Sequence, residues 1–498
     1  MTTSTGVPIT ATGVLLFVLG VVVYLAVRVV LISVMTARRK PSTGMAWTLL
    51  VLTNLPLGLI AYAFFGRTSV GRKRDRQQKQ VNEAIAARTI DYQVTLPAEV
   101  TEHQATMVRL NRSLGALPMT LDNDVTLLPD YAGAVLAMAD AVTEAEAYVH
   151  VEFYITAWDH VTSPLFDALV AATERGVTVR LLFDHLGSRG IPGYREMLAR
   201  LDATRIEYHP MLPLRPLRGQ WRRPDLRNHR KFVVVDGAVG FTGSQNLTEP
   251  SYNKPKLQQA GRQWVELWSR VDGPVVSALD AVFASDWYAE TDEVLPVRSP
   301  AEVASAVVSA EGSVRRVPCQ IVPSGPGFGT ENNLRLFISL IHGASRRVSL
   351  TSPYFVPDES LLYAVTTAAQ RGLDVELFVS EESDQFMVGH AQASYYEALL
   401  EAGVRIWLYP APLVLHAKHF TVDDDVAVLG SSNMDMRSFA LNYEISMMML
   451  GPDIVAGMRR VEDGYRAIAR ELTAEEWAGR SRANRYVDSL MRLTAALQ

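Results

Sequence analysis

The sequence predicts an α/β fold: two duplicated α/β domains related by a pseudo-twofold axis, preceded by a two-helix transmembrane hairpin. Three observations predict this fold: two long apolar runs near the N-terminus, an order of strand-like and helix-like segments that repeats once, and a motif present in both copies. With 498 residues, the chain is also long for one hydrophobic core. We expect a membrane anchor at residues 1–70, a basic linker at 71–90, and α/β domains at 91–305 and 306–498.

The N-terminal runs have the length and composition of membrane spans. The first extends from Ala11 to Val34 and the second from Ala46 to Phe65. Either run is long enough to cross roughly 30 Å of hydrocarbon, so we expect two helices that form a hairpin. Arg28 lies inside the first run, where we expect it to snorkel or to face the second helix. We expect Asn54 and Pro56 to kink the second helix.

Basic residues flank the second run on both sides and bear on its orientation. The connection between the runs contains three of them, and a larger group follows Phe65: Arg67, Arg72, Lys73, Arg74, Arg76 and Lys79. The larger group favours a cytoplasmic location for the catalytic part, whereas Arg38, Arg39 and Lys40 favour the opposite orientation. The sequence thus predicts a multi-pass protein of the cell membrane with a cytoplasmic catalytic part. The larger group either holds anionic lipid headgroups or forms a solvated linker.

Composition narrows the classes of function. The formal net charge of -5 gives no overall attraction to nucleic acid, so no nucleic-acid partner is expected. Cys319 is the single cysteine, which excludes an intramolecular disulfide and a thiolate cluster for zinc. The oligomeric state stays open.

The part after residue 90 contains an internal duplication. A strand-like run at Tyr148–Ile155 corresponds to Arg347–Phe355, and each is followed by a helical stretch that ends in an Arg-Gly pair, at 175–176 and at 371–372. Buried strands are then expected at Thr178–Asp184 and Asp374–Ser380. The segment Pro213–Asn228 has no counterpart in the second copy. Its Arg215, Arg218, Trp221, Arg222 and Arg223 either gather anionic headgroups or belong to a plain surface loop.

Each copy contains the motif His-x-Lys-x-x-x-x-Asp. The motif residues are His229, Lys231 and Asp236 in the first copy and His416, Lys418 and Asp423 in the second. Residues two apart on a strand share a face, so each histidine and its lysine are expected to point into one site. The aspartate precedes a second strand-like run and is expected mainly to fix a tight hairpin turn.

Two further pairs of polar residues follow each motif. The segments Gly-Ser-x-Asn place Ser244, Asn246, Ser431 and Asn433 as neutral donors for phosphate oxygens. Farther along, Glu266 and Glu444 lie on strand-like stretches, where each could fix the tautomer of the histidine of its own copy. A surface glutamate is an equal alternative for both.

The paired motifs, the Gly-Ser-x-Asn segments and the N-terminal runs resemble the phospholipase D superfamily, and within it the bacterial cardiolipin synthases. The resemblance implies one active site across the pseudo-twofold axis, with His229 as nucleophile and His416 as general acid and base. It implies that Lys231, Lys418 and the two asparagines hold the phosphate oxygens, with no metal and no cofactor. The implied reaction transfers a phosphatidyl group from one phosphatidylglycerol to another and releases glycerol, through a covalent phosphohistidine.

Two other functions remain as alternatives. A membrane-bound phospholipase D or phosphodiesterase would use the same residues but water as the acceptor. A nuclease would favour a basic groove, which the net acidity disfavours. A non-catalytic lipid-binding scaffold is expected to lack a histidine or lysine in one motif, and both motifs are complete. The expected partners are phosphatidylglycerol, other anionic lipids and the bilayer itself.

Overall fold

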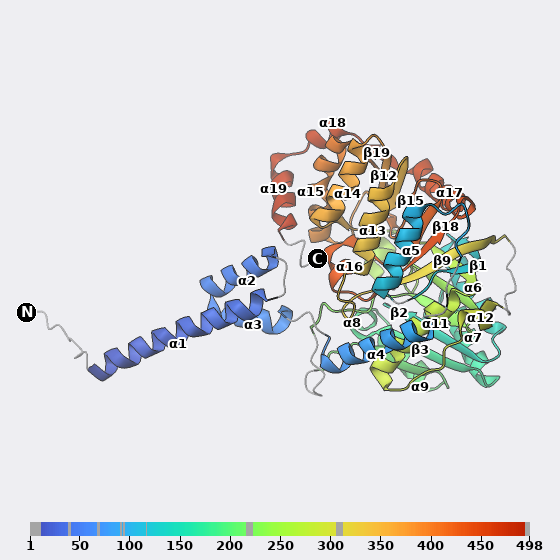
Figure 1. The fold of residues 1–498 in the computed structure, drawn as a ribbon, viewed down its shortest axis with the longest axis horizontal. Coiled ribbons are helices and arrows are strands. Elements are labelled where there is room, and N and C mark those ends of the chain that lie inside the picture. Colours follow the sequence, from blue (N-terminus) through green and yellow to red (C-terminus); the bar gives the residue numbers. More distant parts are fainter. Residues whose placement is uncertain are drawn as a thin grey trace, which may run out of the picture. The chain divides into compact units, whose positions relative to one another are not determined.

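The computed structural model describes residues 11–37, 41–66, 70–89, 92, 95–115, 117–215, 223–304 and 312–493 (Figure 1). The chain divides into two compact units, Met1–Thr68 and Ser69–Gln498, each of which is described by itself. Several residues used in the sequence analysis lie outside the described ranges: Arg38, Arg39, Lys40, Arg67, Arg218, Trp221 and Arg222.

The N-terminal unit contains the helices α1 (Ala11–Thr36), α2 (Pro41–Thr53) and α3 (Leu55–Phe65). Among the described residues, α1 alone is long and apolar enough to cross a membrane. The expected second spanning helix is not continuous, because Asn54 is extended and its side chain accepts a hydrogen bond from the Leu57 amide at 3.0 Å. Pro56 then occupies the first turn of α3, where it needs no amide partner. The second apolar run therefore forms two shorter helices and not one kinked helix.

The basic segment expected as a linker forms the helix α4 (Arg72–Arg88) and belongs to the second unit. Its Arg74 is buried and pairs with Glu290 at 2.5 Å, while the exposed Lys73 pairs with Asp292 at 2.7 Å. Glu290 lies on α11 (Val276–Thr291). One face of α4 thus packs on the rest of the second unit through polar groups. Its charged side chains are therefore not all solvated, as they would be in a linker.

Within the described residues of the second unit, fifteen strands form one mixed sheet. The first half of the unit, residues 117–304, supplies in spatial order β1 (Thr120–Leu128), β8 (Trp268–Asp272), β6 (Val239–Gly243), β5 (Phe232–Val235), β2 (Tyr148–Phe153), β3 (Thr178–Asp184) and β4 (Glu207–Met211). The second half, residues 312–493, supplies β9 (Val314–Ser324), β18 (Glu444–Leu450), β16 (Val426–Gly430), β15 (His419–Val422), β10 (Arg347–Thr351), β12 (Asp374–Ser380), β13 (Arg405–Tyr409) and β19 (Arg470–Leu472).

The strand order is the same in both halves when it is read outward from the centre of the sheet. At the centre, β1 and β9 pair antiparallel, with Asn123 opposite Val317. Outward from that pair, each strand of the first half has a counterpart at the same position in the second half, and β19 adds one strand at the far edge. The predicted duplication is therefore confirmed as an arrangement in space, with a pseudo-twofold axis between β1 and β9.

Helices cover both faces of the sheet (Figure 1). Residues alternate between the faces: in β5, Phe232 and Val234 join the core that also contains α11, whereas Val233 and Val235 join the core under α6 and α7. These first-half helices are α6 (Tyr131–Thr143), α7 (Ser163–Glu174), α8 (His185–Arg189), α9 (Tyr194–Asp202), α10 (Pro255–Gln259) and α12 (Pro300–Ala304). The core under α6 and α7 belongs to the first half, whereas the core on the opposite face, which contains α11, also includes second-half residues such as Phe378 and Met447.

The second half repeats this covering. Its helices, together with α5 (Glu102–Gly115), are α13 (Asn332–Gly343), α14 (Glu359–Gln370), α15 (Phe386–Ala402), α16 (Met436–Ala440), α17 (Pro452–Ile468), α18 (Ala474–Ala478) and α19 (Arg482–Arg492). The predicted helix ends are confirmed, since α7 and α14 end at the Arg-Gly pairs with Gly176 and Gly372 at positive φ. Arg175 then donates to the carbonyls of Val142, Thr143 and Ala145, which fixes the loop before β2.

Candidate functional site

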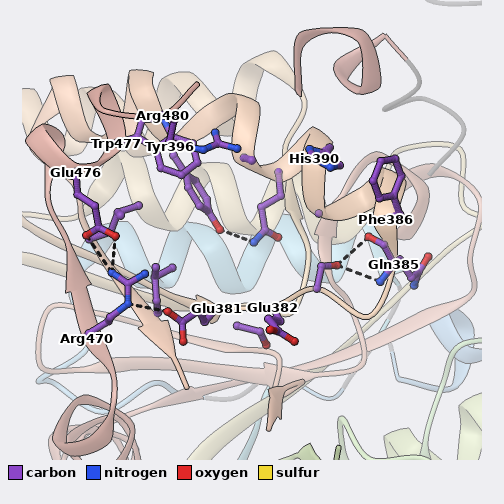
Figure 2. A pocket seen from close by; sticks show the side chains of 17 residues that line it. Glu381, Glu382, Gln385, Phe386, His390, Tyr396, Arg470, Glu476, Trp477 and Arg480 are labelled. Carbon is purple, nitrogen blue, oxygen red and sulfur yellow. Dashed lines mark hydrogen bonds and ion pairs between the residues drawn. The ribbon is translucent and has the colours of Figure 1, made fainter. Parts of the chain in front are cut away.

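Two cavities lined by described residues are of a size to hold a small ligand. The larger, about 540 Å³, lies in the second half between α15, α18 and β19 (Figure 2). Within it, Arg470 bonds to Glu381 at 2.7 Å and to Glu476 at 2.8 Å. No residue of either motif lines it. This cavity is therefore not where the duplicated residues meet.

The second cavity, about 470 Å³, lies where the two halves face each other. Its lining includes corresponding residues from both halves: Tyr154, His229 and Asn246 from the first, and Tyr354, His416 and Asn433 from the second. Both motif histidines are buried in this single site. The cavity is the candidate active site.

The backbone around each histidine bonds to the other half. The His229 amide donates to the Tyr443 carbonyl at 2.8 Å, and the His416 amide donates to the Val265 carbonyl at 2.7 Å. Two short strands, β14 (Val414–Leu415) and β7 (Trp264–Val265), pair in parallel across the same boundary. The histidines and lysines lie on segments just before β5 and β15 and not on those strands, and the histidine amides take their backbone partners from the opposite half.

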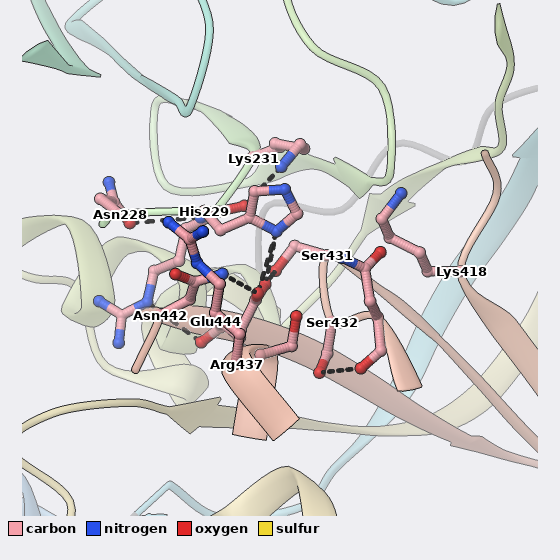
Figure 3. Close-up of polar contacts among 12 residues, drawn as sticks. Asn228, His229, Lys231, Lys418, Ser431, Ser432, Arg437, Asn442 and Glu444 are labelled. Atoms are coloured by element: carbon pink, nitrogen blue, oxygen red, sulfur yellow. Dashed lines mark hydrogen bonds and ion pairs between the residues drawn. The ribbon is translucent and has the colours of Figure 1, made fainter. Parts of the chain in front are cut away.

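Each of the two glutamates bonds to the histidine of the opposite half. The Glu444 carboxylate accepts from His229 Nδ1 with both oxygens at 3.0 Å (Figure 3). Glu266 lies 2.6 Å from His416 Nδ1. The expectation that each glutamate bonds the histidine of its own copy is thus wrong. The crossed backbone pairs place each glutamate segment beside the histidine of the other half. A carboxylate on Nδ1 leaves Nε2 of a neutral ring with its lone pair available.

The serines of the Gly-Ser-x-Asn segments hold the glutamates. Ser431 Oγ donates to Glu444 at 2.5 Å, and Ser431 Oγ also accepts from the Ile445 amide at 3.0 Å. In the first half, Ser244 Oγ accepts from the Leu267 amide at 3.0 Å, next to Glu266. Neither serine lines the cavity. Their geometry indicates a role in positioning the carboxylates in place of the expected contact with phosphate oxygens.

The asparagines do line the cavity. Asn246 donates to the Tyr252 hydroxyl at 2.8 Å and accepts from the Ile155 amide at 3.2 Å. Asn433 has a buried side-chain oxygen with no hydrogen-bond partner among the described residues. Of the two asparagines of the Gly-Ser-x-Asn segments, Asn433 is therefore the one whose side-chain oxygen can still accept a hydrogen bond.

The motif lysines lie immediately behind the histidines. Lys231 Nζ donates to the His229 carbonyl at 2.6 Å, and Lys418 Nζ lies 3.0 Å from His416 Nδ1. Burial lowers the pKa of Lys231 to about 7, against the opposing effect of Glu444, and lowers the pKa of Lys418 to about 8. Both ammonium groups are costly to keep charged in this site, so an anionic ligand would stabilise their charged form.

The two His-Glu pairs differ in their electrostatics. Burial lowers the pKa of His229 well below its usual range, and the lysines Lys231 and Lys418 add to the effect. Burial also lowers the pKa of His416, but Glu266 opposes it. Burial raises the pKa of Glu444 to about 7, whereas the neighbouring cations outweigh burial at Glu266 and leave its pKa lowered. The imidazolium form is therefore favoured at His416 relative to His229.

The motif aspartates lie at hairpin turns, away from the cavity. Asp236 has a φ of 51° and accepts from the amides of Glu146, Ala147 and Tyr148, each at 2.8 Å. Asp423 has the same φ and accepts from the Arg346 amide at 2.7 Å and from its neighbours. Their contacts tie the β5–β6 and β15–β16 turns to the start of β2 and β10, which is the turn-fixing geometry.

Sequence reasoning missed several charged residues of the cavity lining. Arg227 pairs with the buried Asp184 at 3.3 Å, Asp384 accepts from the Tyr354 hydroxyl at 2.8 Å, and Arg437 follows the second Gly-Ser-x-Asn segment. These residues occur in one copy each, so the internal repeat did not point to them. His419, which follows Lys418 directly, faces away from the cavity: its side chain is buried and lies 3.8 Å from Glu462.

Comparisons with known proteins agree with this two-half site. A family model described as "Cardiolipin synthase, PLD-like domain" matches residues 138–287 and 337–462, one stretch in each half. A model described as "Phospholipase_D-nuclease N-terminal" matches residues 21–67.

Relatives cover nearly the whole chain. Cardiolipin synthase A of Pectobacterium carotovorum is 31% identical over 467 residues, which cover 93% of this chain and 94% of that protein. Cardiolipin synthase A of Proteus mirabilis is 32% identical with the same coverage. Among solved structures, phosphatidylserine synthase of Haemophilus influenzae matches with a TM-score of 0.57 at 15% identity and covers 78% of this chain and 97% of that chain, which shows a shared fold.

Proposed function

Because the chain belongs to the cardiolipin synthase family of the phospholipase D superfamily, we propose that it transfers a phosphatidyl group from one phosphatidylglycerol to a second and releases glycerol. The single observation that carries the proposal is the pair of buried histidines at one cavity, each bonded through Nδ1 to a carboxylate of the opposite half. Two histidines at one cavity can serve two successive steps at the same phosphorus: transfer of the phosphatidyl group to one histidine, and then transfer to the acceptor lipid.

In the first step, His229 Nε2 attacks the phosphorus of the donor lipid. A P–N bond forms while the bond from phosphorus to the headgroup oxygen breaks, and His416 gives its proton to the departing oxygen, so that glycerol leaves. The electrostatics support these roles, since the pKa of His229 is held well below its usual range, and Glu266 favours the protonated form of His416. A neutral ring attacks, and a protonated ring donates.

In the second step, the terminal hydroxyl of another phosphatidylglycerol gives its proton to His416 and attacks the same phosphorus. The P–N bond breaks, His229 returns to its neutral form, and the product contains two phosphatidyl groups on one glycerol. Lys231 and Lys418 supply positive charge near the phosphorus throughout, and the side-chain NH2 of Asn433, which lines the cavity, supplies a hydrogen-bond donor. Water competes as acceptor, and the burial of both histidines reduces its access.

We also propose that the protein is an integral membrane protein with its catalytic unit in the cytoplasm. α1 supplies one crossing, and the apolar helices α2 and α3 together have enough length for a second. The basic residues after the second run support this orientation. A reporter fused at residue 40 is expected to lie on the side of the membrane opposite to the cytoplasm. A reporter fused at the C-terminus is expected to lie in the cytoplasm.

A product assay tests the function. Purified protein in mixed micelles with labelled phosphatidylglycerol is expected to form cardiolipin and glycerol, and His416→Ala is expected to lower the rate by about 10²–10⁴-fold. His229→Ala is expected to abolish both the product and any acid-labile labelled phosphoenzyme. Phosphatidic acid as the main product of the wild type would identify a phospholipase D instead, and unchanged cardiolipin formation by His229→Ala would refute the mechanism.

A further inference from the structure

Arg437 differs from the other cations that line the active-site cavity. It lies on α16 (Figure 3), is half-buried, and donates one long hydrogen bond of 3.4 Å to the Asp225 carbonyl. Among the described residues it has no ion pair with a carboxylate. Asp435, two residues earlier, accepts from the Ser438 amide at 2.6 Å and so caps α16. The guanidinium thus faces the cavity with most of its donors unused.

The other cations in and around the cavity either have partners within the protein or lie exposed at the rim of the cavity. Arg227 is buried, pairs with Asp184 at 3.3 Å and donates to the Leu212 carbonyl at the same distance. Lys254 lines the cavity but is exposed. The motif lysines bond to the carbonyls of the histidines. Arg437 is the half-buried cation that is available for a further anion on the His229 side.

The internal duplication places Arg437 in one half only. Counting from the glycine of each Gly-Ser-x-Asn segment, Arg437 lies seven residues after Gly430, and the residue seven after Gly243 is Pro250. The histidine, lysine and asparagine that surround the reacting phosphorus occur in both halves. A cation that occurs once therefore serves a group that the reaction contains once.

The chemistry of the proposed reaction contains such a group. In the first step the leaving group is glycerol, which is neutral, so the reacting phosphate is the sole anion of the substrate. In the second step the attacking hydroxyl belongs to a lipid whose own phosphodiester lies at the other end of the same glycerol. Two phosphodiesters then occupy one cavity, and the second one needs its own positive partner because an unpaired buried charge is costly.

We propose that Arg437 binds the phosphodiester of the acceptor lipid and thereby selects a phosphatidylglycerol, in preference to water or a neutral alcohol, for the second step. The inference rests on the proposed function. Its electrostatic setting agrees, since Arg437 acts with burial and the motif lysines to lower the pKa of His229, which places its charge close to the nucleophile. Arginine also suits the ligand, because its planar donors match two phosphate oxygens.

The experiment compares acceptors with and without a phosphate in the same purified full-length protein. Cardiolipin formation uses phosphatidylglycerol as the acceptor. Exchange of labelled glycerol into phosphatidylglycerol uses the same donor, nucleophile and general base, but its acceptor carries no phosphate. Glycerophosphoglycerol is a third acceptor that carries the phosphodiester without acyl chains. Arg437→Gln is the test variant, Arg437→Lys keeps the charge, and Lys254→Gln is the matched loss of one positive charge at the rim.

We expect Arg437→Gln to lower cardiolipin formation and transfer to glycerophosphoglycerol by about 10- to 100-fold, as for loss of a charged hydrogen bond, while glycerol exchange changes by less than about threefold. Arg437→Lys is expected to recover part of the loss, and Lys254→Gln to leave the ratio of the two reactions as in wild type. Equal losses in all three reactions would overturn the inference, since Arg437 would then serve the donor phosphate or the fold. A wild type that catalyses neither transfer nor exchange would refute the proposed function itself.

Discussion

Replacing Glu266 by Gln is predicted to alter the basic limb of the pH–rate profile through a histidine of the opposite half. The Glu266 carboxylate is buried and lies 2.6 Å from His416 Nδ1, so it stabilises the imidazolium by a charge-assisted hydrogen bond. Such a bond contributes about 1.5–3 kcal/mol, which corresponds to about one to two pKa units. Glu266→Gln removes the negative charge while keeping the shape.

The direction of the shift follows from the role of His416. The ring must be protonated to release glycerol, so activity falls as pH rises through its pKa. Burial already lowers the pKa of His416, and Glu266 opposes that effect. Without the charge the pKa falls further, and the basic limb moves to lower pH. Glu444→Gln instead acts on His229, which must be neutral to attack, so it is the acidic limb that moves to lower pH.

The assay is kcat/KM for cardiolipin formation from labelled phosphatidylglycerol, measured from about pH 5 to about pH 9. Glu266→Gln is expected to move the basic limb by about one to two units and to lower the maximum by about 10- to 100-fold. Glu382→Gln, which removes an exposed carboxylate, serves as the control. If Glu266→Gln moved the acidic limb and left the basic limb in place, the assignment of roles to the crossed pairs would be refuted.

Two further predictions concern stability. Arg74→Ala is expected to lower the free energy of unfolding by about 3–5 kcal/mol, because the Glu290 side chain, 8% exposed, then keeps the Leu212 amide as a donor but loses its cation. Lys73→Ala, which removes an exposed pair on the same helix, is expected to change the free energy of unfolding by less than about 1 kcal/mol. Equal effects in denaturant unfolding would contradict the packed position of α4. Asp423→Ala and Asp236→Ala are each expected to cost about 1–3 kcal/mol by leaving backbone amides without their acceptor. The hydrogen bonds that Asp423 accepts outweigh burial and hold its pKa below the usual range. Its contribution to the free energy of unfolding is therefore complete above the ordinary carboxyl pKa and is lost as the pH falls through the lowered pKa. Unfolding midpoints measured against pH test this dependence.

The sequence was informative where local pattern decides the structure. The strand predictions at Thr178–Asp184 and Asp374–Ser380 match β3 and β12 residue for residue. The duplication also predicted the pseudo-twofold axis, and the structure places that axis between the central strands β1 and β9. Hairpins after Asp236 and Asp423 followed from turn chemistry, and both residues adopt positive φ there.

The sequence was not informative where the partner comes from another part of the chain. Glu266 is closer in sequence to His229 than to His416, yet it bonds to His416 because the parallel pair of β7 and β14 crosses between the halves. No periodicity encodes that pairing. In the same way, α4 is mostly polar and was expected as a linker, since its packing depends on distant acidic residues, Glu290 and Asp292.

The crossed arrangement makes the active site a property of the assembled pair of halves. Each half alone would bury one glutamate and one histidine without their partners, and an unpaired buried carboxylate is strongly destabilising. The central contact of β1 and β9 fixes the register of the two halves, with Asn123 donating to the Val317 carbonyl at 3.0 Å and accepting from the Val275 amide at 2.8 Å. A shift of that register would separate both His-Glu pairs at once. The groups that perform the proposed chemistry therefore also oppose misassembly of the two halves, which couples correct folding to the formation of the site.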